Sequence, residues 1–237
     1  MIDTHAHIDS TLCDIDREVL DAVILSGANL ETSKNNLLLA EKYPFLYPAV
    51  GIHPQELADD INLLEELAKN PSVIAVGECG LEYLGEVDVE KQILYFRKQI
   101  ELAQKYNKPL IIHARKAMDE TIQILSEYKN TRGVIHCYSG GKKRVKKVLE
   151  LDGEWFFGFD GNLTYEVGLE EVVKEIPRDR ILAETDSPLL TPEPFRGEVN
   201  KPEYVKYVYQ KIADIWGESI ESTEKILDAN AKKLFKI

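Results

Sequence analysis

Short apolar runs alternate with amphipathic stretches along almost the whole of this 237-residue chain. The apolar runs are rich in Val, Ile, Leu and Ala, as is typical of strands that are buried on both faces. We expect eight strands, within residues 1–7, 21–27, 46–54, 73–80, 109–115, 133–140, 154–161 and 181–188.

Between most of these runs, apolar residues recur every three or four positions, which is the spacing of a helix that buries one face. Helices are expected within residues 35–43, 55–70, 89–107, 118–130, 142–151 and 169–177. Two more, 204–216 and 222–235, follow the last strand, and Ser222 is the expected N-cap of the second. The proline-rich stretch 187–202 is expected to be an irregular loop, which at this length is either functional or disordered.

Strands that alternate with helices predict a parallel sheet covered by helices, and eight such units predict an α/β protein with a closed (β/α)8 TIM barrel. An open, doubly wound sheet is the structural alternative. Because no long linker, shift in composition or low-complexity tract divides the chain, we expect a single domain over residues 1–237. In a barrel, the carboxyl ends of all strands open onto one mouth, where active sites lie.

The net charge of −12 argues against broad adhesion to nucleic acid or to an anionic membrane, so a polyanion must be bound by a local patch. No apolar run reaches membrane-spanning length. The first expected strand begins at Met1, which leaves no room for a secretory leader, so we expect a cytoplasmic protein without a membrane partner. The cysteines Cys13, Cys79 and Cys137 lack paired spacing, which predicts reduced thiols.

Polar side chains gather at the carboxyl ends of the expected strands. All five histidines lie there, and two acids join them: His5, His7, His53, His113, His136, Glu78 and Asp186. In the first strand, the period of two also places Asp3 and Asp9 on the side of the histidines. One such histidine alone would be a structural residue, but the whole set converging on one mouth predicts a metal site.

The donor set exceeds what one four- or five-coordinate ion with an open position requires, so two divalent ions are expected. A carboxylate has two oxygens and can bridge such a pair. Imidazole and carboxylate ligands together suit zinc, manganese, iron or cobalt, whereas magnesium takes few histidines.

Several of these segments together resemble the ordered motif set of the TatD family of metal-dependent hydrolases, which belongs to the amidohydrolase superfamily. The matching segments are DTHAHID, GIHP, VGECGLEY, PLIIHAR, GVIHCYSG, AETDSP and PFRG, followed by Asn200 and Pro202. The resemblance implies that His5, His7 and Asp186 hold one ion, that His113 and His136 hold the other, and that Glu78 bridges both.

The resemblance also implies an activity, the metal-dependent cleavage of DNA, in particular as a 3′ to 5′ exonuclease on single strands that uses a metal-bridging hydroxide. Removal of D-amino acids from tRNA is the alternative. Two positions depart from the family pattern. Glu82 replaces a usual Asp in a loop expected to face the substrate, and Phe195 replaces a frequent His before Arg196.

Further residues are expected to act on the substrate. Asp186 either accepts the proton of the attacking water or serves as a ligand alone, and His53 either contacts the phosphate or leaving group or anchors its loop. The leaving group is expected to take its proton from His53, acting as an acid, or from solvent. Substrate contacts are also expected from Arg115, Arg196, Ser139, Ser187 and Tyr83, each of which has a plainer structural alternative.

A basic run opens the expected helix at 142–151, where the helix dipole already places positive charge. It comprises Lys142, Lys143, Arg144, Lys146 and Lys147. Either the run, in particular Lys142, Lys143 and Arg144, binds nucleic acid or it is a solvated helix face.

Other chemistries are weaker. His136 and Cys137 are neighbours on a strand and point to opposite faces, which excludes a Cys–His pair between them. Hydrolysis of another ester or an amide by the same ligands, and a metal-loaded binding protein without turnover, remain open. A monomer that acts on DNA or tRNA is expected.

Overall fold

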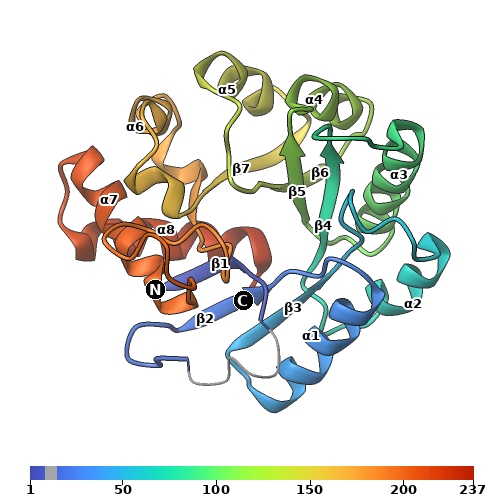
Figure 1. Cartoon of the computed structure of the whole chain (residues 1–237), viewed down its shortest axis with the longest axis horizontal. Helices are drawn as coiled ribbons and strands as arrows, with labels where there is room; N and C mark the ends of the chain where they lie inside the picture. The colour runs from blue at the N-terminus through green and yellow to red at the C-terminus, as the bar shows by residue number, and fades with distance from the viewer. Residues whose placement is uncertain (9–14) are drawn as a thin grey trace.

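The computed structural model describes residues 1–8 and 15–237, so Asp9 and Cys13 lie outside the described residues. Eight parallel strands follow one another in sequence order around a barrel (Figure 1). The strands are β1 (Ile2–Ala6), β2 (Ala22–Leu25), β3 (Leu46–Val50), β4 (Ala75–Glu82), β5 (Leu110–Arg115), β6 (Thr131–Ile135), β7 (Gly153–Phe159) and β8 (Ile181–Ala183).

The segment after β8 closes the barrel against β1. Ala6 forms a parallel bridge with Ser187, and the backbone N–H of His7 donates to the Ser187 carbonyl at 2.8 Å. The backbone N–H of Asp186 donates to the His5 carbonyl at 2.9 Å. The expected (β/α)8 barrel is therefore confirmed, and the doubly wound alternative, which needs a different strand order, is wrong.

Helices surround the strands (Figure 1). They are α1 (Leu30–Lys42), α2 (Leu64–Ala68), α3 (Val89–Lys105), α4 (Met118–Ser126), α5 (Lys142–Leu149), α6 (Leu169–Val173), α7 (Val205–Trp216) and α8 (Ile220–Phe235), with 3-10 turns η1 (Ile61–Leu63), η2 (Gly161–Thr164), η3 (Arg178–Arg180) and η4 (Pro202–Tyr204). No helix within the described ranges combines the length and the apolar character needed to cross a membrane.

Three helix starts differ from the sequence expectation because of local capping. The helix expected at 35–43 already begins at Leu30, since the Asn29 side chain accepts from the backbone N–H of Thr32 and caps α1 there. The helix expected at 55–70 begins only at Ile61, since the Asp60 carboxylate accepts from the backbone N–H of Asn62 and caps η1 there. The N-cap of α8 is Ser219 and not Ser222; the Ser219 hydroxyl accepts from the backbone N–H of Ser222, which lies inside the first turn.

Two apolar cores lie on the two faces of the sheet. One fills the barrel interior with side chains such as Ile24, Ile111 and Phe156. Leu234 and Phe235 at the end of α8 belong to this same cluster and seal the amino-terminal end of the barrel. The larger core lies between the sheet and the outer helices. Because the interior is filled, the mouth at the carboxyl ends of the strands is where a reactive site fits.

Leu234→Ala should destabilise the protein by about 2–5 kcal/mol, because it opens a cavity in the plug of the barrel. Leu234 is fully buried, whereas Leu38 on the outer surface of α1 is 64% exposed. The matched change Leu38→Ala should therefore stay within about 0.5 kcal/mol of the wild type. Urea unfolding of both variants measures the difference, and equal losses would contradict this assignment of the core.

Candidate metal centre at the barrel mouth

Six side chains from five strands meet at the mouth of the barrel. They are His5 within β1, His7 directly after it, Glu78 in β4, His113 in β5, His136 directly after β6, and Asp186 three residues after β8. The structure thus brings together all six residues that the sequence nominated as metal ligands. Within the described residues, two groups of these donors are close enough to share an ion, namely His5, Glu78 and His136, and His5, His7 and Asp186.

Glu78 reaches the mouth from the middle of β4 and not from its end. The register between β4 and β5 shifts between Val76 and Cys79, and such an irregularity re-aims a side chain. A Cβ at Gly51 would lie 2.4 Å from the carbonyl carbon of Gly77, so only glycine allows β3 and β4 to approach this closely. The course of the β4 backbone therefore places the Glu78 carboxylate at the mouth.

Four donor atoms, here called the cage, lie close to one another on one side of Glu78: the Nε2 atoms of His5 and His7 and one oxygen each of Glu78 and Asp186. His5 Nε2 lies 3.1 Å from His7 Nε2, 3.4 Å from Glu78 Oε2 and 3.4 Å from Asp186 Oδ1. His7 Nε2 lies 3.3 Å from the same glutamate oxygen and 3.5 Å from the same aspartate oxygen. Ligands about 2.05 Å from a tetrahedral zinc ion are separated by about 3.3 Å, and the five distances around His5 and His7 are close to that value.

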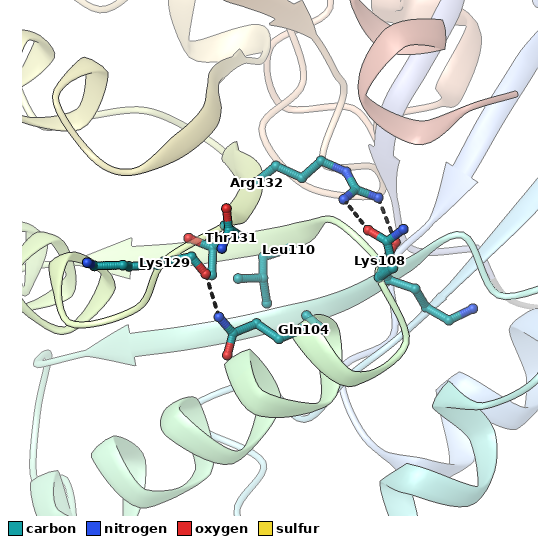
Figure 2. A pocket seen from close by; sticks show the side chains of 9 residues that line it. Gln104, Lys108, Leu110, Lys129, Thr131 and Arg132 are labelled. Carbon is teal, nitrogen blue, oxygen red and sulfur yellow. Dashed lines mark hydrogen bonds between the residues drawn. The ribbon is translucent and has the colours of Figure 1, made fainter.

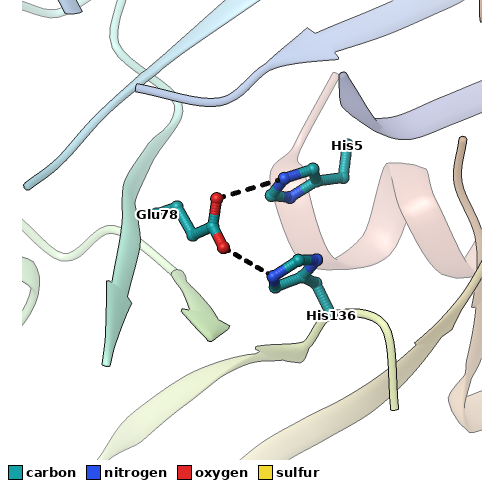
Figure 3. A group of neighbouring side chains, drawn as sticks. All are labelled: His5, Glu78 and His136. Atoms are coloured by element: carbon teal, nitrogen blue, oxygen red, sulfur yellow. Dashed lines mark ion pairs between the residues drawn. The ribbon is translucent and has the colours of Figure 1, made fainter. Parts of the chain in front are cut away.

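A second set of donors faces the other oxygen of Glu78. His113 Nδ1 and His136 Nε2 each lie 2.7 Å from Glu78 Oε1, and 3.2 Å separates the two nitrogens. Figure 3 shows the carboxylate between His5, which faces one oxygen, and His136, which faces the other. This set has three donors, so an ion held by it would keep positions open for water or substrate.

Because the carboxylates of this cluster are buried, positive charge beside them is needed to keep them ionised. The side chains of His5, Glu78 and His136 are at most 4% exposed. Although burial opposes its ionisation, the imidazoles of His136 and His113 hold the pKa of Glu78 well below its usual range. Burial also disfavours a charged His7, yet hydrogen bonds to Asp186 and Glu78 raise its pKa to about 10. Two buried carboxylates among four imidazoles are a chemical fit for bound divalent cations.

His53 lies at the edge of this cluster with its Nε2 atom 3.6 Å from Glu78 Oε1. Its Nδ1 atom accepts a hydrogen bond from the backbone N–H of Gln55 at 3.2 Å, so the imidazole proton lies on Nε2. Burial, together with the neighbouring His113 and His136, lowers the pKa of His53 to about 4. His53 is therefore a neutral hydrogen-bond donor that points into the mouth.

Two buried acids that the sequence analysis did not assign to the site support it from below. Asp3 accepts from the backbone N–H groups of His5 and Thr185 at 3.2 and 2.9 Å and from the Thr185 hydroxyl at 2.6 Å, which ties β1 to the segment that follows β8. Glu184 accepts from the backbone N–H of Cys137 at 2.6 Å and lies 3.6 Å from His136 Nδ1. Both carboxylates hold the backbone on which ligands are mounted.

A groove of about 690 Å³ opens beside the cluster, next to the loops that follow β4, β5 and β6. It collects four of the residues expected to contact substrate, Tyr83, Arg115, Ser139 and Arg144. The Tyr83 hydroxyl donates to Glu120 at 2.6 Å, which fixes the ring on the groove wall. The groove therefore combines arginines, a hydroxyl and an aromatic face with three acids, Asp119, Glu120 and Glu166.

Two other expected substrate contacts are placed differently from each other. Ser187 is fully buried and its backbone takes part in barrel closure, so it does not reach the groove. Arg196 is exposed in the long loop, and its guanidinium carbon lies 3.6 Å from the centre of the Tyr165 ring. Stacking occupies the face of the guanidinium and leaves its N–H edge free for an anion.

Acidic neighbours neutralise most of the basic run on α5. Lys142 pairs with Glu171 at 3.1 Å, and Arg144 and Lys147 both pair with Asp119. Lys146 lies 3.6 Å from Glu150. Of the five basic residues, only Lys143 forms no ion pair with the rest of the described chain, so the run supplies less free positive charge than its sequence suggests.

Two further clusters lie away from the mouth. A cavity of about 330 Å³ is lined by Leu110 and Thr131, the first residues of β5 and β6, and so lies at the opposite end of the barrel (Figure 2). Arg132 is bonded there to the side chain and carbonyl of Asn107. The acidic group of Asp21, Glu224 and Asp228 surrounds the amino group of Met1. Neither resembles the nitrogen-rich centre at the mouth.

Comparisons with known proteins agree along the full length of the chain. The profile of the family described as TatD related DNase matches residues 2–236. YabD of Bacillus subtilis, named an uncharacterized metal-dependent hydrolase, is 36% identical over 257 residues, which cover 100% of this chain and 99% of that protein. TatD of Erwinia billingiae, named a 3′-5′ ssDNA/RNA exonuclease, is 30% identical over 233 residues, which cover 92% of this chain and 88% of that protein.

Among solved structures, YJJV of Escherichia coli, a TatD homologue, superimposes with a TM-score of 0.91 at 27% identity. The alignment covers 100% of this chain and 98% of that one. The same barrel, with the same connections, therefore underlies both chains.

Asp160, which follows β7 below the cluster, should make the stability of the metal-free chain depend on pH. Burial and the nearby Glu184 raise its pKa to about 7 from an ordinary value of 3.8. Because this pKa is higher in the folded than in the unfolded chain, protonation of Asp160 stabilises the fold. The stabilisation is fully present below the unfolded pKa and is lost as the pH rises through 7. Asp160→Asn, which cannot ionise, should therefore gain in Tm relative to the wild type between pH 5 and pH 8, measured in the presence of a chelator. A difference in Tm that stays constant over this range would contradict the shift.

Proposed function

The chain belongs to the TatD family of metal-dependent hydrolases, and on that premise we propose that it cleaves phosphodiester bonds of single-stranded nucleic acid, as a 3′ to 5′ exonuclease that uses two divalent ions. One observation carries the proposal: two nitrogen-rich donor sets face the two oxygens of one buried carboxylate, Glu78. Residues arranged in this way would hold a pair of divalent ions, which would supply positive charge to a phosphate group.

The chain's own residues would divide the work of holding the ions. His5, His7 and Asp186 would bind one ion, His113 and His136 the other, and Glu78 both. When bound, such ions lower the pKa of a water molecule and neutralise charge on the phosphate. Asp186 is 12% exposed at the side chain, so a carboxylate within the cage still touches the open mouth, where it would accept the proton of the attacking water.

His53 would bind the phosphate by a hydrogen bond and not by transferring a proton. A neutral imidazole with a pKa of about 4 has no second proton to give at neutral pH, and its Nε2–H points toward the cluster. The leaving oxygen would then take its proton from solvent. The expectation that His53 contacts the phosphate thus stays within the proposal, while its role as an acid does not.

Three features of the mouth favour a nucleic-acid strand over a small ester or amide. Arg115, with 60% of its side chain exposed, stands beside the ligand His113. Arg196 presents a free guanidinium edge beside the aromatic face of Tyr165. Tyr83 lines the groove and can stack on an unpaired base. A relative named as an ssDNA/RNA exonuclease supports the same substrate class.

Glu78→Gln should abolish metal retention and hydrolysis together, because the amide loses the charge and one of the two oxygens that face the donor sets. We expect the wild type to keep two ions per chain after dialysis and the variant to keep fewer than one, measured by elemental analysis. Cleavage of end-labelled single-stranded DNA and of bis-p-nitrophenyl phosphate should fall by about 10³-fold or more. The matched control is Glu154→Gln, since the carboxylate of Glu154 lies at the opposite end of the barrel, where it pairs with Arg180.

Parallel assays on single-stranded DNA, single-stranded RNA and a D-aminoacyl-tRNA identify the substrate. The proposal expects stepwise shortening of the labelled strand from its 3′ end and no preferential deacylation of the tRNA. Deacylation without strand cleavage would overturn it in favour of ester hydrolysis at the same ligands.

Arg196→Gln should weaken the binding of single-stranded DNA and reduce its salt dependence, because one phosphate contact is lost. Each such contact contributes about 0.7 to the slope of log K against log salt for single strands. The control is Arg178→Gln, since Arg178 also lies over an aromatic ring, that of Trp216, but before β8 at the opposite end of the barrel. Fluorescence anisotropy across a salt series measures both slopes, and an unchanged slope for Arg196→Gln would remove Arg196 from the phosphate path.

A further inference from the structure

Glu82 does not lie in a loop that faces substrate, as the sequence suggested. It is the last residue of β4, and its side chain is only 2% exposed. The side chain of Gln92 on α3 binds both backbone groups of Glu82, accepting from its N–H and donating to its carbonyl at 2.9 Å each. Pairing within the sheet and the contact with α3 therefore both hold the Glu82 backbone, and so position its carboxylate.

The carboxylate of Glu82 contacts a proposed metal ligand from behind. Glu82 Oε2 lies 2.9 Å from Nε2 of His113, while Nδ1 of the same ring faces Glu78 and His136. A neutral imidazole carries one proton, and the nitrogen that binds a cation must be the one without it. A carboxylate can only accept a hydrogen bond, so Glu82 requires the proton on Nε2 and leaves the Nδ1 lone pair directed into the cluster.

The second oxygen of the same carboxylate lies 3.5 Å from Nη1 of Arg115. Glu82 therefore lies between a ligand of the metal centre and an arginine of the substrate groove. Because the carboxylate is buried, its negative charge needs both partners, and their positions are linked through it.

A third ion at this place is the alternative, because His53, Glu82 and His113 offer donor atoms within 4.8 Å of one another. The tautomer of His53 argues against it. Its Nδ1 atom accepts from the backbone of Gln55, so its other nitrogen carries the proton and has no lone pair to donate.

We propose that Glu82 is a positioning residue for the second metal site: it orients His113 and fixes its tautomer, and so sets the affinity of the ion held by His113 and His136 without binding that ion. The proposal rests on the two-ion centre proposed above. It assigns to Glu82 no contact with substrate and none with the reacting atoms.

Three substitutions test this on the full-length chain, with zinc affinity measured by competition with a chromophoric chelator. Glu82→Leu removes the acceptor, Glu82→Gln keeps an acceptor without the charge, and Glu82→Asp shortens the side chain. We expect Glu82→Leu to weaken the weaker of the two sites by about 10–100-fold and to leave the tighter site within about threefold. Glu82→Gln and Glu82→Asp should fall between Glu82→Leu and the wild type. Glu154→Gln is again the control and should match the wild type at both sites.

Other results separate the possible failures. If the wild type binds two ions and Glu82→Leu binds both with unchanged affinity, the positioning role is wrong while the two-ion centre stands. If the wild type binds no pair of ions, the proposed function itself fails. Loss of a third ion from the wild-type count would make Glu82 a ligand, and an equal loss at both sites together with a lower Tm would make its role structural; either result overturns the proposal.

The absorption spectrum of the cobalt-loaded chain gives a readout that does not depend on activity. A reoriented His113 should change the bands of the second cobalt ion added and leave those of the first unchanged. Identical spectra for the wild type and Glu82→Leu would contradict the proposal.

Discussion

The carboxylate of Glu78, buried between two sets of imidazole nitrogens, is the constraint around which the mouth of this barrel is built. A buried negative charge is stable only if positive charge or hydrogen-bond donors meet each of its oxygens. Here the two oxygens face different partners, His5 and His7 on one side and His113 and His136 on the other. Close backbone contact at Gly51 and the irregular register of β4 place the carboxylate where both sets can reach it.

Supporting contacts extend outward from this carboxylate in layers. Asp3 ties the strand that carries His5 to the segment that carries Asp186. Glu82 meets the outer nitrogen of His113, and Glu184 lies near that of His136. Each of these buried acids therefore contacts either a ring of the cluster or the backbone that carries one. Such contacts keep closely spaced side chains in a fixed geometry.

The sequence predicted the barrel and the residues that meet at its mouth, because both follow from period and order. Alternating strands and helices predict the topology, and five histidines at strand ends predict where those side chains converge. Capping was predicted less well, since Ser219 and Ser222 are equally good caps until the preceding turn is known. The period of two placed Asp3 on the side of the histidines, but the contacts of Asp3, Glu82 and Glu184 could not be predicted from the sequence, because their partners lie in other strands or in the segments after them.

The net charge could likewise be predicted from the sequence, whereas the pairing of individual charges could not. An excess of acids argues against broad binding of nucleic acid, and the structure shows that even the basic run on α5 is largely paired with acids on its own surface. Electrostatic attraction for a phosphate backbone would then come from the proposed cations and from Arg115 and Arg196, which lie at the end of β5 and in the loop after β8. Affinity and chemistry would then reside in the same place.

Anomalous X-ray diffraction from crystals of the zinc- or manganese-loaded chain tests the central claim most directly, since it locates each ion without reference to activity. The account predicts two peaks at the mouth, one between His5, His7 and Asp186 and one between His113 and His136, each touching a different oxygen of Glu78. A single peak, or peaks that leave Glu78 without contact, would contradict it.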